Sequence, residues 1–350
     1  MQILNKAIPY AQRCIRTDSG TVVVWPFLNA ERGGGPFELF LDTNALSKSN
    51  WFVQLPEEIR KKCVINPWPA MVEQWISNPD FRKSPADRIG SMTENLVKNG
   101  AQFRKNYAEE QERILKKYDE AFRTQFTIIV PYVAMMKSLL GQKIAAEDAL
   151  QRLEEILQED IPRFTSAIML TALAVLLKGN QSVRLVDDPK PAFSYLSSFL
   201  DFQPGKKDET DYMNVSYLRN RAGDLNLWLT LPMLRQQGYQ FVGAPAIVSG
   251  DRALHRLIVR VIPPVLQENP AMALTLHEEG LPKALCEKII AIGKKVQIRP
   301  GFAEDVQLTR MKNLFELAKQ CCVDEREKEA LDQMFSEWWL PGFGKEFRMS

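Results

Sequence analysis

The sequence predicts an α/β protein with a central, mostly parallel sheet, an inserted helical subdomain and a helical C-terminal extension. Short apolar runs bounded by turn residues predict strands at 21–25, 37–41, 64–65 and 246–248. Amphipathic stretches, the second observation, predict helices between these runs. The third observation is a long, charged, helical pattern over 85–200. It divides the sheet-forming part into 1–84 and 201–265, and residues 266–350 form the extension.

Two elements in the first half are well marked. Phe37–Leu41 follows three glycines and Pro36, which predicts a buried strand that is entered from a sharp turn. Pro69 suits the first turn of a helix, and Glu73 lies within the first turns of that helix.

The second half predicts three helices. Tyr212–Asn220 forms one, which Gly223 and Asp224 end, and Leu225–Gln237 forms the next, with Asp224 as its N-cap or first-turn residue. The apolar spacing over Arg252–Ile262 predicts a third, amphipathic helix. In the insertion, helices are expected over 101–124, 127–140, 145–157 and 164–177.

Composition excludes several classes of protein. The hydrophobic content of 45% and charged content of 25% are typical of soluble globular proteins. The net charge of +2 means that a nucleic-acid binder must concentrate its basic residues locally. Five cysteines form no CxxC pair, and two histidines are too few for an imidazole-based zinc site. Free thiols fit a cytoplasmic location. Residues 167–177 are too few to span a bilayer, so no membrane partner is expected.

Four carboxylates recur in one structural setting. Asp42 and Asp251 each follow a predicted strand, while Glu73 and Asp224 each lie early in a predicted helix. Parallel α/β units bring strand ends and helix starts to one edge of the sheet. Crowded carboxylates repel one another unless a cation offsets their charge, and oxygen ligands favour Mg²⁺ or Mn²⁺. Such ions support phosphodiester hydrolysis. Taken singly, each residue also has a structural explanation as a helix cap or first-turn acid.

The arrangement resembles that of the PIN-domain nucleases, over about 20–80 and 210–262. Four pieces carry the resemblance, namely Phe40–Asn44, Pro69–Glu73, Arg219–Asp224 and Ile247–Asp251. The long helical stretch departs from compact family members, and Asp201 or Asp211 could replace Asp224. The resemblance implies that Asp42, Glu73, Asp224 and Asp251 hold Mg²⁺ or Mn²⁺ and carry catalysis, supported by Thr43, Asn44 and Ser249.

The resemblance further implies a metal-dependent endonuclease that cuts single-stranded RNA, with RNA favoured over DNA. Bacterial relatives of this kind suggest a toxin or defence effector, with a protein inhibitor bound to the helical insertion. Two alternatives stay open. One is a flap-type DNA nuclease whose insertion clamps the strand, and the other is a non-catalytic PIN-like scaffold for protein interaction.

Basic residues follow the last carboxylate. Arg252, Arg256 and Arg260 recur at every fourth position, and Arg252 and Arg256 are candidates to position substrate phosphate. A solvated helix face is the alternative explanation for such a stripe. His255 lies on the same helix, either for proton transfer or as a satisfied structural histidine. The mixed charges over 101–124 predict a solvated helix face with paired side chains.

Overall fold

The structure is a computed structural model that describes residues 2–3, 10–26, 33–177, 195–204, 210–262, 275–276, 283–295 and 304–339. Segments 178–194, 263–274, 277–282, 296–303 and 340–350 of the predicted helical insertion and extension lie outside the described residues. Within the described ranges, no helix is both long and apolar enough to cross a membrane.

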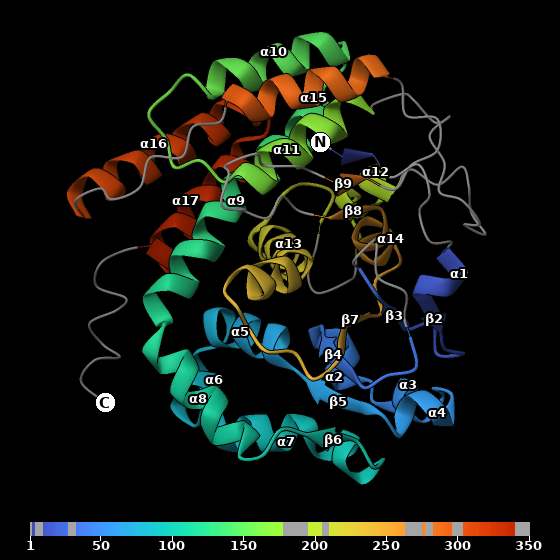
Figure 1. The fold of residues 1–350 in the computed structure, drawn as a ribbon. Helices are drawn as coiled ribbons and strands as arrows, with labels where there is room; N and C mark the ends of the chain where they lie inside the picture. Colours follow the sequence, from blue (N-terminus) through green and yellow to red (C-terminus); the bar gives the residue numbers. More distant parts are fainter. Residues whose placement is uncertain are drawn as a thin grey trace.

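A six-stranded sheet organises the lower half of the view in Figure 1, with strand order β2-β3-β7-β4-β5-β6. Strands β7, β4, β5 and β6 run parallel, and β2 and β3 pair antiparallel at one side. The predicted α/β class with a mostly parallel sheet is therefore confirmed. The strands are β2 (Cys14–Arg16), β3 (Val22–Val24), β4 (Phe37–Leu41), β5 (Cys63–Asn66), β6 (Gln102–Phe103) and β7 (Ala244–Ser249).

Strand β4 lies in the interior of the sheet between β7 and β5. All five of its side chains are buried, as expected for a strand that is covered on both faces. A smaller sheet joins β1 (Gln2–Ile3), β9 (Thr275–Leu276) and β8 (Val261–Ile262). Strand β6 lies inside the range 85–200 that we assigned to the insertion, so the sheet-forming part extends past residue 84.

Short helices connect and flank the strands. Pro69 lies in the first turn of α5, as predicted, and Glu73 lies in its second turn. The helices of this part are α1 (Tyr10–Arg13), α2 (Thr43–Ser47), α3 (Asn50–Val53), α4 (Glu57–Arg60), α5 (Trp68–Ser77), α6 (Pro79–Lys83), α7 (Pro85–Lys98) and α14 (Arg252–Arg260).

Helix α13 (Val215–Gln236) corrects the sequence prediction of two helices broken at Gly223 and Asp224. It begins at Asn214, whose side chain accepts a hydrogen bond from the Tyr217 N–H at 2.8 Å. Asp224 therefore lies in the helix interior rather than at an N-cap. A glycine in a helix interior costs about 1 kcal/mol, and the apolar side chains that α13 buries, among them Leu225, Leu227 and Trp228, stabilise the helix by more than that.

Most of the remaining helices form a layer above the sheet in Figure 1, with α13 between the two, whereas α8 lies low in the view and packs against α7 and α5. Helix α9 packs against α11, α13, α16 and α17, so helices from the insertion and the C-terminal extension share one core. The helices are α8 (Tyr107–Lys117), α9 (Asp119–Gly141), α10 (Ala146–Ile156), α11 (Thr165–Leu176), α12 (Tyr195–Leu200), α15 (Lys283–Lys295), α16 (Glu304–Cys321) and α17 (Glu325–Trp339).

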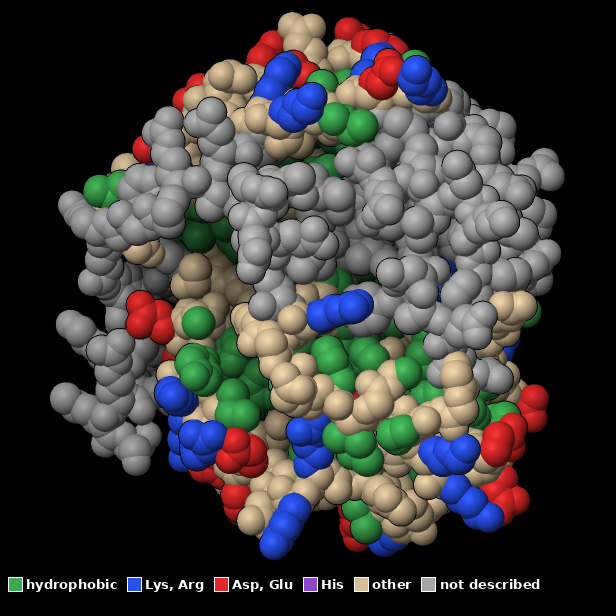
Figure 2. Space-filling model, in the orientation of Figure 1, with side chains coloured by type: hydrophobic (Ala, Val, Ile, Leu, Met, Phe, Trp, Pro, Cys, Tyr) green, Lys and Arg blue, Asp and Glu red, His purple; other side chains and the backbone are tan. Residues whose placement is uncertain are grey.

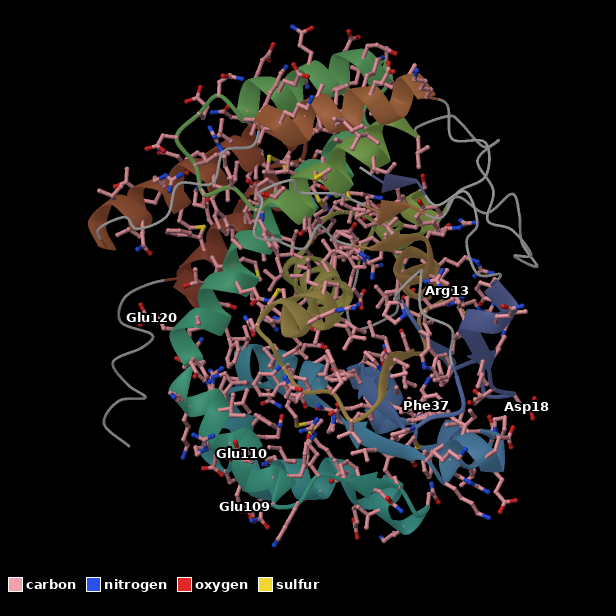
Figure 3. All side chains as sticks on the ribbon, viewed as in Figure 1. Arg13, Asp18, Phe37, Glu109, Glu110 and Glu120 are labelled. Atoms are coloured by element: carbon pink, nitrogen blue, oxygen red, sulfur yellow. The ribbon has the colours of Figure 1, made fainter. Side chains whose placement is uncertain are left out.

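The predicted solvated face over 101–124 is confirmed on α8 and the start of α9. Glu109, Glu110 and Glu120 are exposed there (Figure 3). Lys116 pairs with Glu112 at 2.7 Å, one turn apart on α8. On the face shown in Figure 2, the described Lys and Arg side chains lie among Asp and Glu rather than in one band.

Candidate functional site

The candidate site lies where β4 and β7 end side by side. These neighbouring strands are parallel, with Leu41 opposite Val248, so Asp42 and Ser249 emerge at the same edge of the sheet. The Asp42 N–H donates to the Val248 carbonyl at 3.1 Å, which extends the pairing to the site itself. Local apolar runs therefore bring residues from both halves of the chain together.

Asp42 is a buried carboxylate with several hydrogen bonds. It caps α2 by accepting from the Ala45 N–H, and its Oδ2 accepts from the Gly250 N–H at 3.2 Å. Burial raises the pKa of Asp42 to about 6. Hydrogen bonds, including one from the Ser249 hydroxyl, oppose this rise, and the negative charge of Glu73 adds to it. Asp42 and Glu73 therefore interact as like charges in a desolvated place.

Glu73 reaches the site from α5 and is held between two other helices. Its Oε2 accepts from the Thr43 hydroxyl on α2 at 2.6 Å. On the other side it meets Gly223 of α13, where an added Cβ would lie 3.2 Å from the Glu73 Cδ. Gly223 thus gives the Glu73 side chain the room that it occupies, a role that its sequence position did not indicate.

The other two predicted carboxylates lie beside this pair with partners of their own. Asp224 follows Gly223, and its Oδ2 accepts from the Arg221 Nη1 at 3.2 Å. Asp251 caps α14, where its Oδ1 accepts from the Ala253 and Leu254 N–H groups, both at 2.8 Å. The capping explanation considered for Asp42 and Asp251 is therefore realised in both.

The supporting residues connect these groups. The Ser249 Oγ accepts from the Asp251 N–H at 3.0 Å and also bonds the Asp42 carboxylate, so it links the ends of the two strands. Asn44 lies next to Gly250, with its Cβ 3.8 Å from the position of a Cβ on that glycine. The alternative acids Asp201 and Asp211 are exposed.

The donor set was tested against a divalent cation. In the part of the chain that the structure describes, no three or more His, Cys, Asp or Glu side chains group closely enough to hold a metal. Magnesium, however, commonly uses one or two carboxylates and keeps several waters. Asp42 and Glu73 fit that role because they are oxygen donors whose like charges interact. Asp224 and Asp251, as placed here, do not join them.

The predicted basic face of α14 is wrong for two of its three arginines. Arg252 is exposed, but Arg256 and Arg260 are 3% and 0% exposed. The Arg256 Nη1 donates to the Arg252 carbonyl at 3.2 Å, and the Arg260 guanidinium stacks on the Tyr195 ring with 4.5 Å to its centroid. Helix α12 and strand β3 pack on α14. Arg256 is therefore not accessible to a substrate phosphate, and this face of α14 is not solvated either.

His255 is a satisfied structural histidine, the second of the two explanations offered for it. It is 3% exposed, and its Nε2 shares a hydrogen bond with the Tyr10 hydroxyl at 2.8 Å. The Nδ1 lies 3.3 Å from the Asp251 carbonyl.

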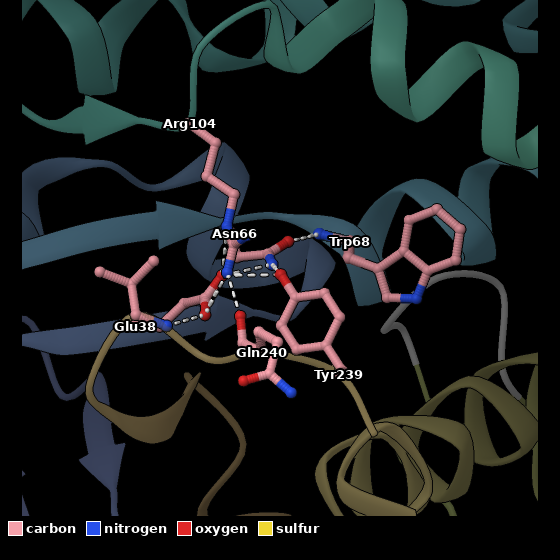
Figure 4. Close-up of polar contacts among 7 residues, drawn as sticks. Glu38, Asn66, Trp68, Arg104, Tyr239 and Gln240 are labelled. Atoms are coloured by element: carbon pink, nitrogen blue, oxygen red, sulfur yellow. Dashed lines mark hydrogen bonds and ion pairs between the residues drawn. The ribbon is translucent and has the colours of Figure 1, made fainter. Parts of the chain in front are cut away.

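Sequence reasoning missed a buried polar cluster around Glu38, drawn in Figure 4. Glu38 is 0% exposed in β4, and its carboxylate accepts from Arg104 at 3.0 and 3.1 Å, which joins β4 to the segment after β6. Asn66, Tyr239 and the Val242 N–H donate at 2.9 Å each. A charged residue inside the apolar run 37–41 was the available signal, because a buried charge needs partners.

Comparisons with known proteins found no match for this chain. No protein-family model, no curated protein and no solved structure matches it significantly.

Proposed function

We propose that the protein is a Mg²⁺- or Mn²⁺-dependent endonuclease that hydrolyses phosphodiester bonds in single-stranded RNA. The observation that carries this proposal is the pair Asp42 and Glu73. Burial and the charge of Glu73 raise the pKa of Asp42, at a sheet edge where α/β proteins bind ligands. The preference for RNA, and a role as a toxin or defence effector, come from the motif resemblance.

In this proposal Asp42 and Glu73 hold the cation, and neighbouring hydroxyls orient them. Thr43 fixes one oxygen of Glu73, and Ser249 with the Gly250 N–H fixes Asp42. A bound divalent cation would supply an activated water and offset the charge that develops on phosphate. Arg252 is the exposed arginine of α14 beside Asp251, and it is the proposed phosphate contact.

The test is cleavage of single-stranded RNA by purified protein in Mn²⁺, beside the Asp42→Asn variant. The control is Asp80→Asn, which changes an exposed aspartate that pairs with Lys83 at 2.7 Å. We expect cleavage by the parent and by the control, none by Asp42→Asn, and none in EDTA. A flapped DNA substrate in the same assay separates the RNA nuclease from the flap-type alternative. Equal cleavage by parent and Asp42→Asn would overturn the proposed role of Asp42.

A second candidate function, a non-catalytic scaffold for protein interaction, has one specific observation in its favour. Each of the four carboxylates has a hydrogen-bonded structural partner, and two of them cap helices. In this proposal the helical insertion binds a protein partner. Unchanged melting of the parent with Mn²⁺ or EDTA, together with no cleavage, would favour the scaffold over the nuclease.

A further inference from the structure

Arg221 on α13 is a buried arginine whose head group is fixed on several sides. Its side chain is 2% exposed, and its guanidinium lies 5.2 Å from the centroid of the Tyr217 ring and 5.6 Å from that of Phe199. The Nη2 donates to the Asp201 carbonyl at 3.1 Å. These contacts join α13 to the end of α12 and leave little rotational freedom to the guanidinium.

The fixed guanidinium engages Asp224 beside the candidate site. The two residues are three positions apart on α13, and their side chains meet at 3.2 Å between Nη1 and Oδ2. Asp224 is 21% exposed, and its neighbour Gly223 touches Glu73. Consecutive Cα atoms are about 3.8 Å apart, so the backbone of Asp224 lies one residue along α13 from the glycine that faces Glu73.

We propose that Arg221 is a positioning residue that holds Asp224 out of the candidate metal site. This inference rests on the proposed function. Three ionised carboxylates close together repel one another, and Arg221 supplies the counter-charge for the third. A divalent cation at Asp42 and Glu73 competes with Arg221 for Asp224. This role of Arg221 explains why Asp224, although part of the motif, forms no group of three possible metal ligands with Asp42 and Glu73 among the described residues.

The experiment measures Mn²⁺ affinity from the signal of free Mn²⁺ in electron paramagnetic resonance, with no substrate present. The variants are Arg221→Met, Asp224→Asn, the double variant of these two, and Asp42→Asn. We expect Arg221→Met to bind Mn²⁺ roughly tenfold more tightly, the order expected from one charge-assisted hydrogen bond. Asp224→Asn alone should stay within about twofold of the parent, and the double variant should lose the gain.

The matched control is Arg219→Met. Arg219 lies on the same helix, but it pairs with Glu337 of α17 at 3.1 Å and not with Asp224. We expect its Mn²⁺ affinity to equal that of the parent. If near-ultraviolet circular dichroism shows that Arg221→Met does not fold, Arg221→Lys replaces it. Lysine keeps the positive charge but cannot donate to Asp224 and to the Asp201 carbonyl as the guanidinium does, so we expect an Mn²⁺ affinity between those of the parent and Arg221→Met.

The outcomes separate this inference from the proposed function. Suppose that the parent binds Mn²⁺ and that Asp42→Asn does not, while a folded Arg221 variant binds Mn²⁺ no more tightly than the parent. That result would overturn the role of Arg221 and leave the proposed nuclease function standing. A loss in Asp224→Asn as large as that in Asp42→Asn would also overturn it, because Asp224 would already be a ligand. Binding by the Arg221 variant alone would support the inference. No binding by any form would overturn both.

Discussion

The burial of Asp42 beside Glu73 predicts an unusual pH dependence of stability in the metal-free protein. The pKa of this carboxyl rises from 3.8 to about 6 in the folded chain, mainly through burial. At about 1.36 kcal/mol per pH unit, the gap from 3.8 to 6 corresponds to about 3 kcal/mol. The folded state binds this proton more tightly than the unfolded state does. The contribution of Asp42 to stability is therefore greatest below about pH 4 and is lost as the pH rises through about 6.

The perturbation that isolates this effect is Asp42→Asn, because asparagine does not titrate. The asparagine loses part of the cap, since its amide cannot accept from both the Ala45 and Gly250 N–H groups, but that loss does not depend on pH. The free energy of unfolding should therefore fall by about 2.4 kcal/mol more in the parent than in the variant between pH 4 and 7.

The assay is urea unfolding in EDTA at half-unit steps of pH, followed by far-ultraviolet circular dichroism. Groups away from the site are unaffected by the substitution, so the difference between parent and variant reports Asp42 together with its interaction with Glu73. Asp80→Asn is the control with the opposite sign, because Lys83 lowers the pKa of Asp80 and its contribution is lost as the pH falls. A parent-minus-variant difference that stays constant from pH 4 to 7 would refute the desolvated pair.

Three further predictions follow from contacts at the site and the sheet. Thr43→Val removes the hydroxyl that orients Glu73, and should reduce Mn²⁺ affinity severalfold by calorimetry, whereas Thr43→Ser should keep it. Gly223→Ala adds a Cβ at 3.2 Å from the Glu73 Cδ, so RNA cleavage should fall severalfold. The control is Gly90→Ala, whose added Cβ would meet no atom within 4 Å, and it should raise the melting temperature and leave cleavage intact. Equal effects of the two substitutions on cleavage would contradict the role of Gly223. Glu38→Gln places an amide NH₂ group among groups that already donate hydrogen bonds, and it should lower the free energy of unfolding in urea by about 3 kcal/mol. A decrease below about 1 kcal/mol would refute the claim that this cluster stabilises the fold.

The sequence was most informative where structure depends on a short local pattern. The strand over Phe37–Leu41 has the predicted bounds, because an apolar run after a glycine turn determines it locally. The rule that strand ends and helix starts share one edge of a parallel sheet predicted that four carboxylates converge, and of these Asp42 and Glu73 interact. The hydroxyls of Thr43 and Ser249 contact these carboxylates, as a supporting role requires.

Long-range packing determined what the sequence could not predict. Helix α13 continues through Gly223 because it packs against α5, α9, α14 and α17, although local propensity favoured a break. The burial of Arg260 depends on Tyr195 of α12, which lies more than fifty residues earlier in the chain. Strand β6 has two residues and exists because β5 offers a parallel partner, so no periodicity could reveal it.

The two capping aspartates differ in a way that bears on function. Keeping Asp42 ionised at neutral pH costs about 3 kcal/mol even with the capping hydrogen bond from the Ala45 N–H included, because burial outweighs that bond. Capping of the short helix α2 therefore does not by itself explain why this carboxylate is buried. Asp251 is only partly buried and accepts two N–H bonds at the start of α14, so capping alone accounts for its position. A bound cation that offsets the charge of Asp42 and Glu73 would remove the imbalance at Asp42, which is why we place the proposed metal there.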